Sequence, residues 1–263
     1  RVAEHFRADS VPIISPLMKP TNLYANVFQT IPSENFLEQT MINYVKSDSL
    51  RTSVVIISDQ GSRAISNRIK AQIPKGVQVF SKKNKEGKDA FYINATEVNS
   101  ALNSGKNYIF IETVNAGLVL NVLSSLNSMI SKNKEIILVT TNKTEAFDYE
   151  YLSNNQLGNL KFHYPSINKN FNSDQPNGFV KQYKAIYGIE PNKYAVRGFD
   201  LTLDVLLRLA SDTDLYKASG NDVETEYVEN KFRYAKKLSG GYYNESVYIL
   251  KYTPELTIEV VKQ

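Results

Sequence analysis

The sequence has 263 residues, of which 42% are hydrophobic and 22% charged, with a formal net charge of +4. This composition is typical of a globular protein, and the length suits one large domain or two smaller ones. The absence of cysteine excludes disulfides and thiolate metal sites, and no apolar run approaches the roughly 20 residues of a membrane helix. The densest basic run, Lys82 to Lys88, is too short for a nucleic-acid-binding face and indicates a solvated loop.

Strand and helix patterns alternate from the start of the chain to residue 164. Strands are expected at 11–15, 53–58, 77–80, 108–112, 135–140 and 159–164, with an alternating segment at 23–31. Residues 1–8 are expected to be the tail of a helix. Further helices are expected after Ser33 as N-cap and around 65–73, 96–102, 118–130 and 149–152. Uninterrupted apolar strands are typical of a sheet covered on both faces. The alternation therefore predicts a parallel α/β sheet with right-handed crossovers.

The rest of the chain has a different pattern. A polar segment at 165–178 predicts a crossing between layers, and Phe179, Tyr183 and Ile186 predict a helix that stops at Gly188. A second helix follows Pro191, and its apolar side chains share one face: Val196, Phe199, Leu203, Leu206, Leu207 and Ala210. A further helix is expected at 222–234, then a turn at 239–241 and a hairpin of strands 246–252 and 256–261.

The segment from Phe179 to Asp200 reads F-x-x-x-Y-x-x-x-Y-G-x-x-P-x-x-x-A-x-x-G-F-D. It resembles the helical corner of type I periplasmic binding proteins of the branched-chain amino-acid receptor kind. The strand VPIISP (11–16) is similar to the fourth strand of their first lobe. The resemblance implies a two-lobed α/β fold with parallel sheets flanked by helices and a first lobe that is incomplete at its N-terminal side. Lobe I would comprise 1–30 and 165–240, and lobe II 31–164 and 241–263.

Motifs for catalysis are missing from the sequence. It contains no G-x-x-x-x-G-K-[ST], G-x-G-x-x-G or G-x-S-x-G motif. The two histidines, His5 and His163, have no second ligand type near them in sequence, so His163 is interpreted as a packed or surface residue. The carboxylates Asp200 and Asp204 are interpreted as a helix surface. We therefore expect no enzyme, no cofactor and no metal site.

Ligands of open parallel sheets bind beyond the carboxyl ends of the strands. That rule selects polar loops after four apolar strands, and their candidate ligand-binding residues are Ser15, Ser58, Asp59, Gln60, Glu112, Thr113, Thr140 and Asn142. Hydroxyls and amides suit a small polar ligand, although the same residue types also cap helices, which is an equally good explanation of each loop by itself. The resemblance implies the same loops, but Glu112 and Thr113 stand where many members carry an aromatic residue or glycine.

The leading hypothesis is non-catalytic binding of a small polar ligand, amino acid-like or similar, in a cleft between the lobes. The resemblance implies a periplasmic or outer-membrane-anchored substrate-binding protein of a transporter or sensor, with no nucleic-acid partner. The alternative is a cell-envelope interaction module of the same fold, such as a cell-wall-associated or peptidoglycan-associated lipoprotein that has lost its ligand. The unusual Glu112-Thr113 loop and the 17 tyrosines favour that alternative.

Overall fold

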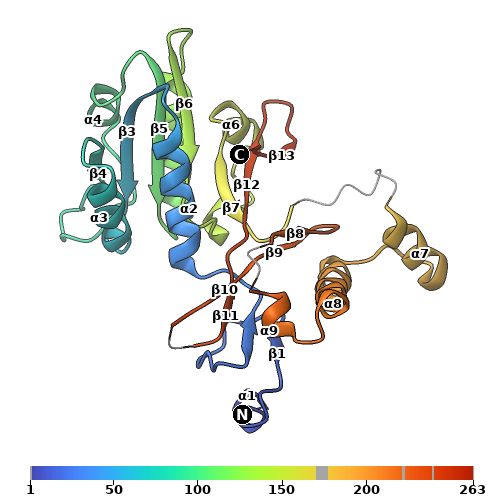
Figure 1. Ribbon diagram of the computed structural model, residues 1–263. Helices are drawn as coiled ribbons and strands as arrows, with labels where there is room; N and C mark the ends of the chain where they lie inside the picture. The colour runs from blue at the N-terminus through green and yellow to red at the C-terminus, as the bar shows by residue number, and fades with distance from the viewer. Residues whose placement is uncertain (1, 170–176, 221–222, 239, 263) are drawn as a thin grey trace. The chain divides into compact units, whose positions relative to one another are not determined.

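The computed structural model describes residues 2–169, 177–220, 223–238 and 240–262. The chain divides into two compact units, whose elements Figure 1 labels. Unit 1 comprises Arg1–Phe36 and Ile167–Tyr248, and unit 2 comprises Leu37–Ser166 and Ile249–Gln263. The assignment of these units to lobes I and II stays a prediction.

Unit 2 is built on a seven-stranded sheet with the order β13-β12-β7-β6-β5-β3-β4. Its strands are β3 (Arg51–Ser58), β4 (Val77–Phe80), β5 (Gly105–Glu112), β6 (Lys134–Val139), β7 (His163–Ser166), β12 (Tyr248–Tyr252) and β13 (Ile258–Val260). Its helices are α2 (Glu34–Ser47), α3 (Arg63–Gln72), α4 (Ala95–Ser100), α5 (Ala116–Met129) and α6 (Asn154–Asn159), with a 3-10 turn η1 (Glu145–Phe147). The neighbours from β4 to β7 all pair in parallel, which confirms the predicted parallel sheet.

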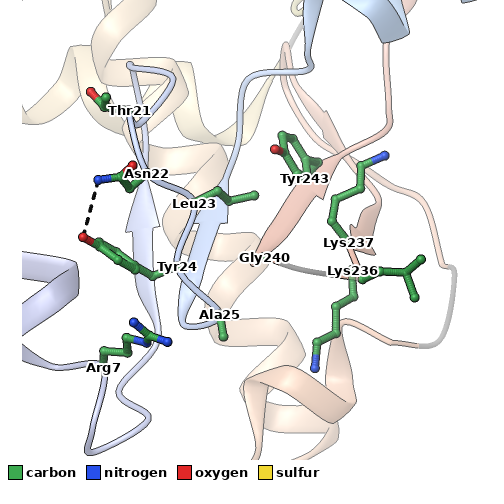
Figure 2. A pocket seen from close by; sticks show the side chains of 11 residues that line it. Arg7, Thr21, Asn22, Leu23, Tyr24, Ala25, Lys236, Lys237, Gly240 and Tyr243 are labelled. Carbon is green, nitrogen blue, oxygen red and sulfur yellow. Dashed lines mark hydrogen bonds between the residues drawn. The ribbon is translucent and has the colours of Figure 1, made fainter.

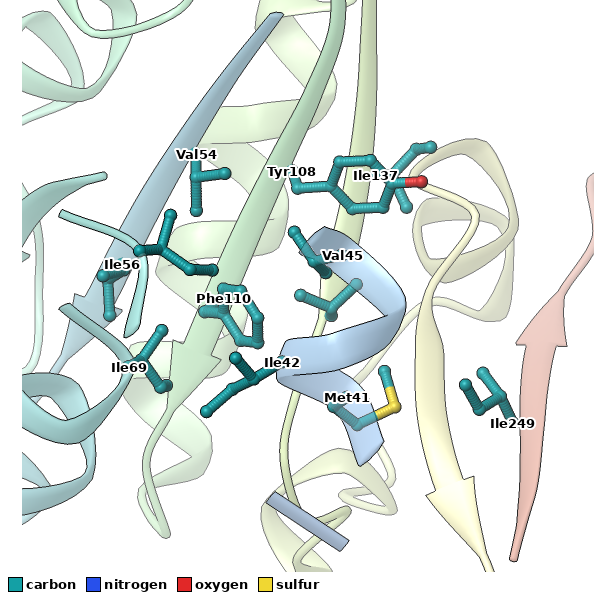
Figure 3. Close-up of a cluster of buried hydrophobic side chains, with 12 residues drawn as sticks. Met41, Ile42, Val45, Val54, Ile56, Ile69, Tyr108, Phe110, Ile137 and Ile249 are labelled. Carbon is teal, nitrogen blue, oxygen red and sulfur yellow. The ribbon is translucent and has the colours of Figure 1, made fainter. Parts of the chain in front are cut away.

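The core of unit 2 forms between α2 and the central strands. Met41, Ile42 and Val45 on one face of α2 are fully buried and belong to the same cluster as Ile56 of β3 and Phe110 of β5. Figure 3 shows the helix lying across these strands with the apolar side chains gathered between them. Each such side chain stabilises the fold by about 1.5 to 3 kcal/mol through the removal of apolar surface from water. This packing fixes the strands that carry the candidate site.

Unit 1 contains a smaller sheet with the order β1-β2-β11-β10. Its strands are β1 (Ile13–Ser15), β2 (Val27–Gln29), β10 (Tyr234–Lys236) and β11 (Tyr242–Asn244), beside a separate pair β8 (Thr225–Glu226) and β9 (Lys231–Phe232). Its helices are α1 (Val2–His5), α7 (Gly178–Tyr187), α8 (Lys193–Ser211) and α9 (Leu215–Ala218). β1, β2 and β11 are parallel, and β10 is antiparallel to β11. The aromatic core centres on Phe28, whose ring stacks on Tyr242 with 4.3 Å between centroids.

The helical corner and the terminal hairpin agree with the sequence. Asn177 caps α7 by accepting from the backbone N–H groups of Phe179 and Val180, and Gly188 ends the helix in the left-handed conformation with φ of 73°. β12 and β13 form the expected antiparallel hairpin. Of the turn expected at 239–241, residue 239 lies outside the described residues, as do 170–176 of the crossing segment and 221–222. No helix in the described ranges has the length and apolar character to cross a membrane.

The prediction of a helix at 222–234 is wrong. The described part of this segment forms β8, β9 and β10 instead, with β8 and β9 pairing in antiparallel fashion. The bend between them depends on a distant residue, because Asp200 of α8 accepts hydrogen bonds from the backbone N–H groups of Val228 and Glu229. A helical reading of the apolar spacing could not include that tertiary contact.

Most of the α8 side chains that are buried in unit 1 are charged, contrary to expectation, although Val196 of the predicted apolar face is buried as expected. Asp200 and Asp204 are 0% exposed, whereas Leu206 and Leu207 are 58% and 52% exposed. The Arg208 Nε donates to Asp204 Oδ2 at 2.9 Å, and Asp200 accepts hydrogen bonds from backbone N–H groups and from the Asn230 amide, so both buried carboxylates have partners. Because pairing and hydrogen bonding offset the cost of burying charge, the carboxylates lie inside. Their interpretation as a helix surface is therefore wrong.

The segment before β7 also differs from the prediction. No helix covers 149–152; η1 precedes this stretch, and α6 follows it, capped at Ser153. The strand expected at 159–164 begins only at His163. Gly158 explains the position of α6, since a Cβ there would overlap the carbonyl oxygen of Thr253 in the β12–β13 turn. The close approach at Gly158 and the fully buried side chains of Leu157 and Leu160 position this short helix.

We predict opposite effects of alanine at two glycines of unit 1. A Cβ at Gly241 would overlap the carbonyl oxygens of Val27 and Tyr24, so Gly241→Ala should destabilise unit 1 by about 1 to 3 kcal/mol. A Cβ at Gly198, within α8, meets nothing within 4 Å, so Gly198→Ala should stabilise by about 0.5 to 1 kcal/mol. Urea unfolding followed by circular dichroism measures both. Equal effects of the two substitutions would contradict the close packing at Gly241.

Candidate functional site

Parallel pairing brings the predicted site residues of unit 2 to one edge of the sheet. β3 ends at Ser58 and β5 ends at Glu112, and these two residues are partners in the register of the β3–β5 pair. β6 ends at Val139, directly before Thr140. We call the buried polar residues at this edge the carboxyl-edge cluster: Ser58, Asp59, Glu112, Thr113, Thr140 and Thr141. Gln60 is half-buried and Asn142 is exposed beside the cluster.

Glu112 is the most deeply placed carboxyl of the cluster. Its side chain accepts hydrogen bonds from the backbone N–H and the hydroxyl of Thr141, at 2.8 and 2.7 Å. Burial raises the pKa of Glu112 to about 8, because desolvation outweighs these hydrogen bonds. Glu38 adds a smaller upward effect, and the Arg68 guanidinium that pairs with Glu38 opposes it. Glu112 is thus a buried carboxyl group that keeps its proton to a higher pH than usual and is hydrogen-bonded to the β6 loop.

Asp59 joins the β3 loop to the β5 loop. Its Oδ2 accepts from the Thr113 hydroxyl, and its Oδ1 accepts from the backbone N–H of Ser62 at 2.7 Å, at the start of α3. The Thr113 hydroxyl in turn accepts from the backbone N–H of Asn115, the N-cap of α5. These contacts are the capping role considered from the sequence. They orient the starts of two helices toward the same edge.

Asp89, which the sequence analysis did not select, supports the loop that follows β3. Asp89 accepts from the backbone N–H of Gln60 at 2.9 Å and from the Ser81 hydroxyl. Burial opposes ionisation of Asp89, but the hydrogen bonds from Ser81, Gln60 and Phe91 outweigh it and lower the pKa of this carboxyl. Asp89 belongs to the lysine-rich loop that was interpreted as solvated, and no local pattern distinguishes it from its charged neighbours.

Three groups at this edge keep hydrogen-bonding capacity. The Ser58 hydroxyl is buried and has no hydrogen-bond partner among the described residues. Thr140 donates its hydroxyl to the carbonyl of Asn142 at 3.1 Å, which shapes the loop and leaves the Asn142 side chain in solvent. Gln60 and Asn142 are therefore the predicted site residues best able to contact a ligand, since Ser58 is 0% exposed. The Gln60 Oε1 already accepts from Arg63 at 3.2 Å, so its amide N–H groups are the part that remains for a ligand.

Ser15, the remaining predicted residue, ends β1 in unit 1. Its hydroxyl donates to the carbonyl of Met18 at 2.7 Å, and its carbonyl accepts from the Thr30 hydroxyl at 2.8 Å. The carboxyl ends of the parallel strands β1 and β2 lead into a pocket of about 220 Å³, called the β1–β2 pocket here. It is lined by Leu17, Ile31, Ile167, Asn168, Lys193, Tyr194, Arg197, Glu229 and Asn230.

Arg197 organises the β1–β2 pocket. Its guanidinium is 7% exposed and donates to the carbonyl of Pro16 at 2.7 Å, to Asn230 Oδ1 at 2.6 Å and to the Thr30 hydroxyl at 2.9 Å. These acceptors are uncharged, and burial lowers the pKa of Arg197. Across the pocket, burial and the charge of Asp200 raise the pKa of Glu229. The pocket therefore offers a cation and a carboxyl group close to apolar walls.

The described residues offer no arrangement suited to a metal ion. Within the described ranges, no three His, Asp or Glu side chains gather as a metal site would require. His163 is buried and stacks on Tyr44 with 5.4 Å between ring centroids, and burial lowers its pKa to about 4. The interpretation of His163 as a packed residue is thus confirmed.

Comparison with solved structures identifies proteins with a similar fold. An ABC transporter substrate-binding protein from Desulfitobacterium hafniense aligns with a TM-score of 0.52 and 19% identity over 98% of this chain and 76% of its own. The chain therefore has the fold of type I periplasmic binding proteins, as predicted. An extracellular ligand-binding receptor from Rhodopseudomonas palustris aligns with a TM-score of 0.46 and 11% identity over 99% of this chain and 77% of its own. No protein-family model and no curated protein matches the sequence.

We predict that Glu112 makes unit 2 less stable as pH rises. Below pH 4.5 the carboxyl is protonated in both folded and unfolded chains; between 4.5 and about 8 only the unfolded chain loses the proton, so the free energy of unfolding falls. The slope is as much as about 1.4 kcal/mol per pH unit. Glu112→Gln preserves the neutral shape and should remove this slope in urea titrations from pH 5 to 8.

The matched control is Glu97→Gln, since Glu97 is a partly exposed carboxylate on α4. That variant should keep the pH dependence of the parent protein. Parallel stability curves for the parent and Glu112→Gln would show that Glu112 ionises at its ordinary pKa.

Proposed function

We propose that this chain binds a small polar ligand without catalysis, in a cleft between its two lobes. The ligand is amino acid-like, and the protein serves a transporter or a sensor as its substrate-binding component in the periplasm or on the outer membrane. The observation that carries the proposal is the convergence of the loops after β3, β5 and β6 at one edge of a parallel sheet. Ligands of open α/β sheets bind at such an edge.

The internal hydrogen bonds of the carboxyl-edge cluster support this function. A binding surface must hold its polar groups in place before the ligand arrives, because ordering them later reduces affinity. Asp59, Thr113 and Glu112 perform that task, since their partners lie within unit 2. Gln60 and Asn142 then present amide groups at the surface.

The β1–β2 pocket supports an amino acid-like ligand. Its volume of about 220 Å³ limits the part of a ligand that it can hold to a small group. Arg197 and Lys193 favour a carboxylate, whereas Glu229 favours an amino group. Leu17 and Ile31 supply apolar contacts for the remainder of the ligand.

A panel of amino acids, short peptides and monosaccharides tests the proposal by thermal denaturation. A compound present at 100 times its dissociation constant adds about 2.7 kcal/mol to stability, which raises the melting temperature by several degrees. Gln60→Ala and Asn142→Ala should each weaken binding of that compound about fivefold, which is the effect of one lost hydrogen bond.

Asn99→Ala is the control for these variants, because Asn99 bonds to Lys134 at the opposite end of β6. It should leave the affinity unchanged. Failure of every compound to shift the melting temperature of folded protein would contradict the proposal.

The alternative, a cell-envelope interaction module, has one observation in its favour. Apolar side chains of α7 and α8 are exposed, among them Ile186 at 71% and Leu206 at 58%. Exposed apolar groups that cluster on an element are typical of surfaces that contact other macromolecules. Co-sedimentation with insoluble peptidoglycan, lost in Leu206→Lys, together with no thermal shift from any compound, would favour this function.

A further inference from the structure

A second hollow of unit 1 lies at the opposite edge of its sheet from the β1–β2 pocket. Lys236 at the end of β10 pairs with Tyr242 at the start of β11, and Tyr242 pairs with Phe28 of β2. The segment before β2 therefore meets Lys237, Leu238 and Gly240, which follow β10, where the parallel strands begin. We call this hollow the amino-edge groove; it has a main part of about 740 Å³ and a side part of about 250 Å³ that share Arg7, Ala25 and Lys236.

Close backbone packing shapes the groove. A Cβ at Gly240 would lie 2.9 Å from the carbonyl oxygen of Leu23, and Gly241 donates its N–H to that same oxygen at 3.1 Å. Tyr216 closes the side part by donating its hydroxyl to the carbonyl of Ser10 at 2.8 Å. The walls are thus fixed by main-chain contacts and not by long side chains alone.

The groove is positively charged and aromatic. Arg7 lies over the Tyr24 ring at 5.5 Å, and Lys237 lies over the Tyr243 ring at 5.3 Å. Figure 2 shows Arg7 and Tyr24 on one side of the groove and Lys236, Lys237 and Tyr243 on the other. No Asp or Glu is among the described residues that line it.

The available charge comes mainly from Arg7 and Lys236. Lys237 reaches Glu245 at 3.4 Å, which offsets part of its charge. Neither Arg7 nor Lys236 forms an ion pair within the part of the chain that the structure describes. An anion in the groove would therefore meet two cations that no carboxylate has neutralised.

Asn26 adds an unmet hydrogen-bond acceptor to the side part. Its side chain is 2% exposed, and its amide nitrogen donates to the carbonyls of Ala3 and Val11 at 3.0 Å each. Two carbonyl partners fix which end of the amide is nitrogen, so Oδ1 is the buried atom without a partner. A buried acceptor without a donor is costly, and a ligand O–H or N–H would satisfy it.

We propose that the amino-edge groove binds a small sugar that carries a phosphate or carboxylate group. The anionic group pairs with Arg7 and Lys236, the sugar hydroxyls face the side part that Asn26 lines, and the ring lies along Tyr24 and Tyr243. The main volume falls in the range of known small-molecule sites. This site lies at the amino ends of the strands, so it is separate from the ligand edge of the proposed function.

Isothermal titration calorimetry of the intact chain tests the proposal with defined probes. Glucose 6-phosphate and glucuronate represent the two anions; glucose, inorganic phosphate and cyclohexanecarboxylate each lack one required feature. We expect at least one acidic sugar to bind tenfold or more tightly than these three, and its identity names the anion. Equal binding of inorganic phosphate would show an adventitious anion effect and overturn the proposal, as would no binding of either acidic sugar.

Charge-matched variants locate the binding. Arg7→Gln combined with Lys236→Gln should weaken binding of the acidic sugar tenfold or more. Lys83→Gln combined with Lys85→Gln removes the same charge from an exposed loop of unit 2 and should leave the affinity unchanged. Equal weakening by both pairs would contradict a site in the groove. Each variant should keep the circular dichroism spectrum of the parent, because all four side chains are exposed.

Discussion

The parallel pairing of β3, β5 and β6 is the constraint on which the rest of unit 2 depends. It sends the polar residue that follows each apolar strand to the same edge, where burial makes every unpaired group costly. Asp59 accepts a hydrogen bond from Thr113, and Glu112 accepts one from Thr141. The buried polar groups are therefore satisfied by hydrogen bonds between loops that are far apart in sequence. The pKa of Glu112 is raised because desolvation outweighs the hydrogen bonds that it accepts.

Sequence patterns predicted the elements whose determinants are local. The strand SVVIIS and the corner ended by Gly188 needed no tertiary information, because apolar runs and a left-handed glycine identify them. The charged inner face of α8 could not be predicted in this way. Asp200 and Asp204 are stable inside only because backbone N–H groups near 228–230 and the guanidinium of Arg208 reach them. The predicted apolar stripe is buried at Val196, but its leucines Leu206 and Leu207 are exposed.

For the candidate site, too, the sequence predicted the local features and not those that depend on tertiary contacts. The rule for carboxyl ends located Ser58, Asp59, Glu112 and Thr113 at one edge, but whether each binds a ligand or supports a loop depends on contacts that sequence spacing does not contain. Asp89 and Arg197 illustrate the point, since each supports a loop far away along the chain. Unit 1 presents two chemically different edges, with opposite charges at the β1–β2 pocket and cations at the amino-edge groove. We infer that these edges serve different ligands.

The central claim is that the ligand binds at the carboxyl edge of β3, β5 and β6. Amide hydrogen exchange with and without the stabilising compound tests it most directly, because the measurement shows which residues the compound protects. A small polar ligand bound at the edge formed by β3, β5 and β6 should slow exchange at 59–62, 113–116 and 141–144 in unit 2. Exchange at the amino-edge groove should not change. Binding of the compound with no slowing at the edge formed by β3, β5 and β6 would contradict the account.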